Sequence, residues 1–109
     1  MSEALAPAER ETQLRLLAGW SYEDDSRSLK RRFKFGTFED VIVAVVRISV
    51  AAERMDHHPS WSNNYDILDI RLTTHDAGDV SMLDFDFARL IDLIVAETQN
   101  YHVRETEHA

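Results

Sequence analysis

The 109-residue sequence contains no cysteine and has only three glycines and two prolines. Without cysteine there are no disulfide scaffolds, thiolate zinc sites or thiol nucleophiles, so any nucleophile must be oxygen or nitrogen. The three glycines, Gly19, Gly36 and Gly78, form neither a glycine-rich phosphate loop nor a Gly-x-Ser-x-Gly motif. Nucleotide binding through such a loop and serine hydrolase chemistry are therefore unsupported.

Positive charge and long apolar runs are also scarce. Twelve Lys and Arg stand against twenty Asp and Glu, a formal net charge of −8, which would repel a nucleic-acid backbone. The most apolar stretch, residues 41–52, contains Arg47 and is too short to cross a bilayer, and residues 1–8 lack the pattern of a secretory signal. We therefore expect a cytoplasmic protein that binds neither nucleic acid nor membrane.

What the sequence does contain is enough apolar material for one core. The hydrophobic fraction is 44%, with 9% aromatic residues, which suits a single compact domain at this length. We predict one domain over residues 1–109, with an ordered core of about residues 8–100 and a polar tail after Asn100 that frays.

The N-terminal third predicts a helix and a hairpin. Pro7 suits the first turn of a helix over residues 8–17, and Gly19 is a suitable stop. Residues 20–22 and 29–35 read as two strands. Alternate side chains of the longer strand share one face, and they are Leu29, Arg31, Phe33 and Phe35.

The segment after Thr37 predicts a second helix. Thr37 and Asp40 form a helix-start pattern, and apolar side chains follow at helical spacing. Residues 41–50 are rich in β-branched side chains, so a strand is the competing interpretation; the start signal and the length favour the helix. Because Pro59 disfavours helical geometry in the residue before it, we expect residues 56–59 to form a loop.

The C-terminal half predicts a strand and a third helix. Residues 65–74 alternate between apolar and polar side chains, as in a half-buried antiparallel strand, and His75 stands at its end. Ser81, with Asp84 three residues on, resembles a capping box. The apolar side of the helix that follows consists of Leu83, Phe87, Leu90, Ile91 and Ile94.

The order of these elements predicts the fold class. Helices separated by antiparallel strands indicate a two-layer α+β sandwich. One face of such a small sheet would be bare, so we expect it to be buried against a second copy of the chain.

The densest group of reactive side chains lies around His57 and His58. Glu53 precedes this pair by four and five residues, and Trp61 and Tyr65 follow closely. Imidazole both gives and takes a proton near neutral pH, and a nearby carboxylate can orient it. The residues alone thus suggest an acid/base site beside aromatic side chains that could contact a flat ligand.

Each of these residues also has a structural interpretation. Two adjacent histidines are often solvated loop residues, His75 could simply end a strand, and Asp84 could serve only the helix start. Trp61 and Tyr65 could be core or interface aromatics. A zinc site is less favoured, because adjacent histidines rarely aim at one metal and there is no His-x-x-x-His spacing.

A longer pattern carries a resemblance to a known family. The run from Glu53 to Tyr65, Glu-Arg-Met-Asp-His-His-Pro-Ser-Trp-Ser-Asn-Asn-Tyr, is followed by Thr73-Thr74-His75 and by Asp84. This order and spacing resemble the signature of the pterin-4a-carbinolamine dehydratase family. Gly19-Trp20 and Phe33-Lys34-Phe35 also look like the family, so the resemblance covers about residues 14–94.

The resemblance implies a hydro-lyase that converts 4a-hydroxytetrahydropterin (4a-hydroxytetrahydrobiopterin) to quinonoid dihydropterin and water in tetrahydrobiopterin recycling. It implies a catalytic group of His57, His58, His75, Glu53 and Asp84. It implies substrate contacts from His57, His58, Pro59, Trp61, Thr74, His75, Asp76 and Ala77. The pterin is the substrate, and no metal or bound cofactor is implied.

The family resemblance also implies a four-stranded antiparallel sheet with helices on one face, in the order α-β-β-α-β-β-α, and assembly as homodimers or homotetramers. The fourth strand would lie within residues 56–61 or 75–80. Three positions depart from the family pattern, and they are Ile67, Asp69 and Asp79.

Two alternative functions stay open within this resemblance. Some family members act as dimerisation cofactors for a transcription factor, which would be a protein-binding role. A dehydratase-like protein could also act on another pterin, such as a molybdopterin-related one.

Overall fold

The computed structural model describes the backbone of residues 3–108 and the side chains of residues 3–99. The backbone of residues 101–108, for which a frayed tail was predicted, continues the last helix to His108. Among the helices of the described part, none is long and apolar enough to cross a membrane. The elements follow in the order α1 (Pro7–Arg15), β1 (Ser21–Glu23), β2 (Ser28–Lys34), α2 (Phe38–Met55), β3 (Ser60–Asn64), β4 (Ile67–Leu72), the 3-10 helix η1 (His75–Ala77) and α3 (Met82–His108).

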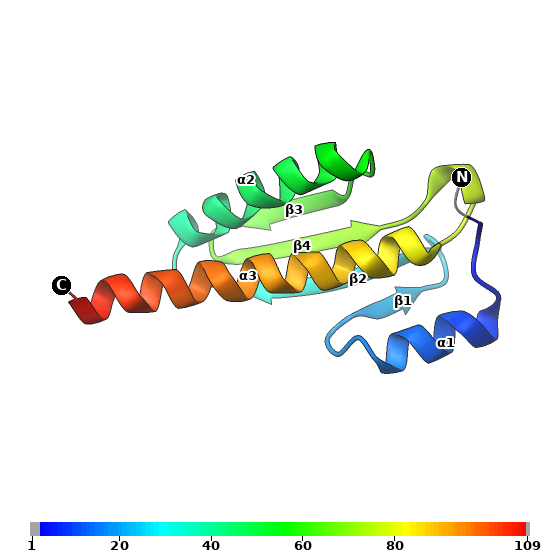
Figure 1. The fold of residues 1–109 in the computed structure, drawn as a ribbon, viewed down its shortest axis with the longest axis horizontal. Helices are drawn as coiled ribbons and strands as arrows, with labels where there is room; N and C mark the ends of the chain where they lie inside the picture. Colours follow the sequence, from blue (N-terminus) through cyan, green and yellow to red (C-terminus); the bar gives the residue numbers. More distant parts are fainter. Residues whose placement is uncertain (1–2, 109) are drawn as a thin grey trace.

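The four strands form one antiparallel sheet in the order β1-β2-β4-β3, and α2 and α3 pack side by side across it (Figure 1). Strand β4 pairs with two neighbours, so that its Ile70 lies opposite Arg31 of β2 and Trp61 of β3. The predicted two-layer α+β sandwich, with a four-stranded antiparallel sheet and helices on one face, is confirmed.

Alternate strand positions and one side of each long helix supply the core. The strands contribute Leu29, Phe33, Leu68, Ile70 and Leu72, and the helices contribute Val41, Ala44, Ile48, Phe87 and Ile91. These side chains follow a period of two in the strands and about 3.6 in the helices, as burial on one face requires. Coverage of one face by α2 and α3 therefore fixes which face of the sheet is buried.

The fourth strand lies where local sequence gives little signal. Strand β3 overlaps the predicted range 56–61 only at Ser60 and Trp61, and Ser62, Asn63 and Asn64 complete it. Serine and asparagine are poor strand formers, so pairing with β4 determines this strand. Tyr65, predicted as a strand residue, instead has φ 54° in the turn before β4.

Helix α2 begins as predicted. The Thr37 hydroxyl accepts a hydrogen bond from the Asp40 backbone N–H at 3.1 Å, and the β-branched residues that follow are helical. The helix ends at Met55, before the predicted loop. The first helix is shorter than predicted, because α1 ends at Arg15 and Leu16 beyond it is 70% exposed.

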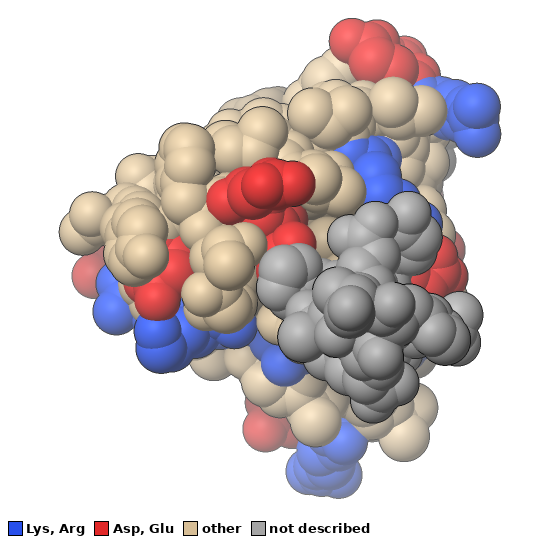
Figure 2. Space-filling view, turned by 90° about the vertical axis from the view of Figure 1, so that its left-hand side faces the viewer, with Lys and Arg blue, Asp and Glu red and all other residues tan. Residues whose placement is uncertain are grey.

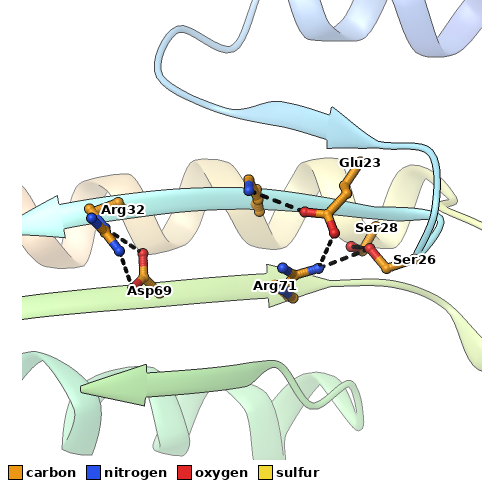
Figure 3. Close-up of polar contacts among 7 residues, drawn as sticks. Glu23, Ser26, Ser28, Arg32, Asp69 and Arg71 are labelled. Atoms are coloured by element: carbon orange, nitrogen blue, oxygen red, sulfur yellow. Dashed lines mark hydrogen bonds and ion pairs between the residues drawn. The ribbon is translucent and has the colours of Figure 1, made fainter. Parts of the chain in front are cut away.

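The face of the sheet opposite the helices carries charged side chains in pairs (Figure 3). Arg32 donates two hydrogen bonds to the Asp69 carboxylate at 2.9 and 3.1 Å, and Arg71 donates to Glu23 at 2.8 Å. Hydrogen bonding from Arg32 lowers the pKa of Asp69. At the end of the molecule seen in Figure 2, basic and acidic side chains also lie near one another. Asp69, which departs from the family pattern, thus has a partner on this open face.

The N-terminal segment is attached to the chain just before α3. The Leu5 backbone N–H donates to the Val80 carbonyl at 3.0 Å. The Tyr22 hydroxyl donates to Asp79 at 2.9 Å, and the Arg10 guanidinium lies 3.8 Å from the centre of the Tyr22 ring. Asp79, a second departure from the family pattern, therefore links β1 to the segment that enters α3.

Gly19 allows a close approach of Arg31 to the chain between α1 and β1. Gly19 has φ +89°, and a Cβ atom there would lie 2.6 Å from the guanidinium carbon of Arg31. Arg31 donates to the Ala18 carbonyl at 3.2 Å and to Asp92 of α3 at 3.0 Å. Trp20 donates to the same Asp92 carboxylate oxygen at 2.9 Å. The absence of a side chain at position 19 makes this arrangement possible.

Candidate active site

A pocket of about 470 Å³ opens where the end of α2, the end of β4 and the first turn of α3 meet. The side chains and backbone that line it belong to Met55, Asp56, His57, His58, Thr73, Thr74, His75, Asp76 and Leu83. The structure therefore brings together the three histidines that the sequence singled out.

The end of α2 turns His57 toward the interior. Asp56 takes the left-handed conformation, φ 51° and ψ 43°, which aspartate tolerates better than most residues. The His57 backbone N–H then reaches back to the Ala52 carbonyl at 3.1 Å, which ends the helix. As a result, His57 is 9% exposed, while its neighbour His58 is exposed.

Asp84 is fully buried beneath the pocket and has a donor for each of its oxygens. Its Oδ2 accepts hydrogen bonds from the Ser81 backbone N–H at 2.9 Å and from the Thr74 hydroxyl at 2.8 Å. Its Oδ1 lies 2.6 Å from Nε2 of His57. Of the predicted capping box, the half in which the Asp84 carboxylate accepts the Ser81 backbone N–H is present, and the same carboxylate also orients a histidine.

His58 and Glu53 form a second histidine–carboxylate pair, at the surface. His58 Nε2 lies 3.6 Å from the Glu53 carboxylate, and the two side chains are 57% and 79% exposed. Water screens such a pair, so it holds the ring less firmly than Asp84 holds His57. The site thus contains one fixed imidazole and one that exchanges readily with solvent.

His75 enters the pocket from η1, directly after β4. The Thr74 backbone N–H donates to the Asp79 carbonyl at 3.3 Å, and Gly78 with φ 73° closes the turn. His75 and Asp76 are both exposed at the pocket. This short turn places the third histidine opposite the end of α2.

Three residues with a predicted substrate contact, Pro59, Trp61 and Ala77, are not among those that line the pocket. Trp61 lies on β3 opposite Ile70 and is 40% exposed. Glu53 is connected to the pocket through His58.

Four lining residues were not predicted as site residues: Met55, Asp56, Thr73 and Leu83. The first three are part of the quoted family pattern or adjacent to a predicted residue, so the sequence offered a signal for them. Leu83 gave none, because its position in the pocket depends on how α3 packs.

The pocket supplies proton donors and acceptors. Three imidazoles surround one cavity, and two of them have carboxylate neighbours that can orient the ring. Among the described residues, no three His, Asp or Glu side chains are grouped so as to hold a metal ion. Fold and site together define a small α+β protein with a histidine-rich acid/base pocket.

Comparison with known families agrees with this description. The family model described as "Pterin 4 alpha carbinolamine dehydratase" matches residues 3–94, and the chain belongs to this family. A protein of Bradyrhizobium sp. (strain ORS 278), named "Putative pterin-4-alpha-carbinolamine dehydratase", is 41% identical over 96 residues, which are 88% of this chain and 96% of that protein. A protein of the same name from Mesorhizobium japonicum is 47% identical over 73 residues, 67% of this chain and 74% of that one.

Two solved structures are similar. One is titled a transcriptional coactivator/pterin dehydratase from Brucella melitensis; its TM-score is 0.82 at 34% identity, and the match covers 85% of this chain and 99% of that one. The other is a pterin dehydratase-like protein identified as a RuBisCO assembly factor in the alpha-carboxysome, with a TM-score of 0.63 at 18% identity, covering 71% and 89%. The second likeness shows the fold alone.

Proposed function

We propose that this chain catalyses the dehydration of 4a-hydroxytetrahydropterin to quinonoid dihydropterin and water. The observation that carries the proposal is the meeting of His57, His58 and His75 around one pocket in a member of this family. In this reaction the bond between C4a and the hydroxyl oxygen breaks, the oxygen leaves as water after it gains a proton, and the ring loses a proton. One acid and one base are therefore needed, and imidazoles can supply both near neutral pH.

The histidines that would transfer these protons lie in different surroundings. His57 is held by the buried Asp84, whereas His58 and His75 are exposed and can exchange protons with water. Met55 and Leu83 add apolar surface for a flat bicyclic ring. The pterin would be the substrate, the reaction would need no metal or bound cofactor, and tetrahydrobiopterin recycling in the cytoplasm is the role we propose.

The test is the rate at which the purified protein converts 4a-hydroxytetrahydropterin to quinonoid dihydropterin. The wild type should accelerate the reaction equally with and without EDTA, and the double variant H57A/H75A should not accelerate it. K34A is a suitable control, because Lys34 lies on the open face of the sheet, paired with Asp66. A folded wild type without activity would refute the proposal and favour another pterin, such as a molybdopterin-related one, or a protein-binding role.

We also propose that the chain forms a homodimer or homotetramer through the outer face of α2. This face exposes a row of apolar side chains, and they are Phe38, Ile42, Val43, Val46 and Val50. A groove of about 410 Å³ beside it, lined by Leu90 and Ile94 among others, continues the apolar surface onto α3. A second copy is the proposed occupant, because one self-complementary face can bury itself around a two-fold axis. The open face of the sheet, which the sequence led us to expect at the contact with a second copy, carries charged pairs and is therefore less suited to such burial than the apolar face of α2.

A further inference from the structure

The buried Asp84 carboxylate belongs to a hydrogen-bonded chain that is longer than the His57 pair. The Thr74 hydroxyl lies 2.8 Å from Asp84 Oδ2 and 2.7 Å from the Ser81 hydroxyl. Thr74 and Ser81 are 7% and 0% exposed. Four side chains from three segments, namely Ser81, Thr74, Asp84 and His57, thus form one buried series.

The Ser81 hydroxyl does not have the usual role of a serine before a helix. At the start of α2, the Thr37 hydroxyl accepts the Asp40 backbone N–H. At the start of α3, the Asp84 backbone N–H is bonded to the Ser81 carbonyl, and the Ser81 hydroxyl is bonded to Thr74. The serine therefore serves the buried series rather than the helix cap.

The acceptors in this series set the direction of every hydrogen bond. An ionised carboxylate can only accept, so Thr74 donates its hydroxyl proton to Asp84 Oδ2. Thr74 can then only accept from Ser81, so the Ser81 hydroxyl donates. The other oxygen, Oδ1, lies 2.6 Å from His57 Nε2, and because a carboxylate oxygen can only accept, we infer that the ring proton is on Nε2. Bonds aligned in this way strengthen one another.

The remaining ring nitrogen, Nδ1 of His57, is left for the pocket. Among the described residues, no buried side-chain nitrogen or oxygen lacks a hydrogen-bond partner. The one side-chain hydrogen bond that the structure shows for the His57 ring is through Nε2, and its ring contact with Phe87 involves no polar atom of Phe87, so Nδ1 is accessible and His57 lines the pocket. With Nε2 carrying a proton, Nδ1 is the nitrogen that can take up or release one there.

We propose that Thr74 and Ser81 are positioning residues that act through Asp84 to keep the proton of His57 on Nε2 and to present Nδ1 to the ligand. The catalytic consequence rests on the proposed dehydration. The arrangement of the protons does not, so it can be tested separately. Thr74, predicted from resemblance as a substrate contact, would contribute through its hydroxyl and not by touching the pterin.

The first test is nuclear magnetic resonance of protein labelled with 15N-histidine, with H57Q used to assign the His57 signals. In the wild type, the imidazole N–H of His57 should be on Nε2, shifted downfield by its carboxylate partner and slow to exchange with water. In T74V this resonance should move upfield and exchange about fivefold faster or more, because Asp84 loses one of its fixed donors. T74S, which keeps the hydroxyl, should restore the wild-type signal.

The second test separates positioning from ligand contact by steady-state kinetics. Ser81 does not line the pocket, so any effect of S81A on the reaction must act through other residues. We expect T74V and S81A each to lower kcat about fivefold with KM changed less than about twofold, and T74S to recover kcat. T98V is the matched control, because Thr98 is also buried but donates its hydroxyl to the Ile94 carbonyl on α3.

The outcomes are distinct from those of the function test. A wild-type His57 with its proton on Nδ1 would overturn the proposal even if every variant failed to fold. A folded T74V with an unchanged His57 N–H resonance, or a T74V whose KM rises while kcat stays constant, would also overturn it. An inactive wild type with the expected Nε2–H signal would refute the proposed dehydration and leave the proposed positioning intact.

Discussion

Nε2 of His57 lies 2.6 Å from Oδ1 of Asp84, across 27 residues of sequence. This contact joins the end of α2 to the first turn of α3, and both side chains are almost fully buried. It differs in burial from the Glu53–His58 pair only a few residues away. The two pairs therefore allow a buried histidine–carboxylate contact to be compared with a solvent-exposed one in the same protein.

His57 and His75 should differ in their contribution to stability. H57A removes a ring from a buried pair and leaves Asp84 short of one donor, so we expect a loss of about 3–5 kcal/mol in the free energy of unfolding. H75A should cost less than about 0.5 kcal/mol, since His75 is exposed. Both variants should lose most of the proposed activity. Urea unfolding measures the difference, and equal stability of the two variants would contradict the buried position of His57.

Asp84 and Glu53 should likewise contribute unequally to the free energy of unfolding. D84A removes the acceptor for Thr74, Ser81 and His57 and should cost about 3–5 kcal/mol. E53A should leave the unfolding free energy unchanged within error, because Glu53 is 79% exposed and 3.6 Å from its partner. Thermal and urea denaturation of both variants check this. A large loss in E53A would show that the surface pair is structural.

Acidic substitutions on α2 should dissociate the proposed oligomer. Val46 and Val50 are 56% and 46% exposed on the outer face of that helix. Burying a new carboxylate between two copies is costly, so V46D/V50D should sediment as a monomer while keeping the helical circular dichroism of the wild type. L16D is the control, because Leu16 is 70% exposed just beyond α1. A wild type that sediments as a monomer at micromolar concentration would refute the oligomer.

Asp92 should make the stability depend on pH. Burial raises its pKa, against the opposing hydrogen bonds from Trp20 and Arg31. Since the folded pKa lies above the unfolded value, the contribution of Asp92 is fully present below the unfolded pKa and is lost as pH rises through the folded pKa. The stability of the wild type relative to D92N should therefore fall as the pH rises from about 4.

Tryptophan fluorescence during urea unfolding at a series of pH values measures this change. D86N is the matched control on the same helix, because the Asp86 side chain is 61% exposed. A stability difference between the wild type and D92N that rises with pH, or stays constant, would contradict the predicted direction.

The sequence predicted those elements whose signals are local. The alternation around Leu68 and Ile70 predicted β4, and Thr37 with Asp40 predicted the start of α2 in spite of its β-branched residues. Packing of one helix face favoured the helix over the strand that those residues prefer alone. Strand β3, by contrast, depends on pairing with β4, so its Ser and Asn residues gave no usable local signal.

For the candidate site too, the sequence predicted some features and could not predict others. The family pattern pointed to His57, His58 and His75, and the structure shows that they share a pocket. No spacing rule could show that Thr74 and Ser81 bond to each other, because that contact depends on how the chain turns through η1. The pattern also could not separate a buried histidine from an exposed one, since that difference arises from the left-handed Asp56.

Gly19 and Arg31 constrain how related sequences can diverge. The guanidinium of Arg31 occupies the space that a side chain at position 19 would need, and it does so while bound to Asp92. The backbone at position 19 is a second obstacle, because its φ of +89° strains any residue with a side chain. We expect related sequences that keep this backbone conformation to keep glycine at position 19 even where a shorter side chain replaces Arg31.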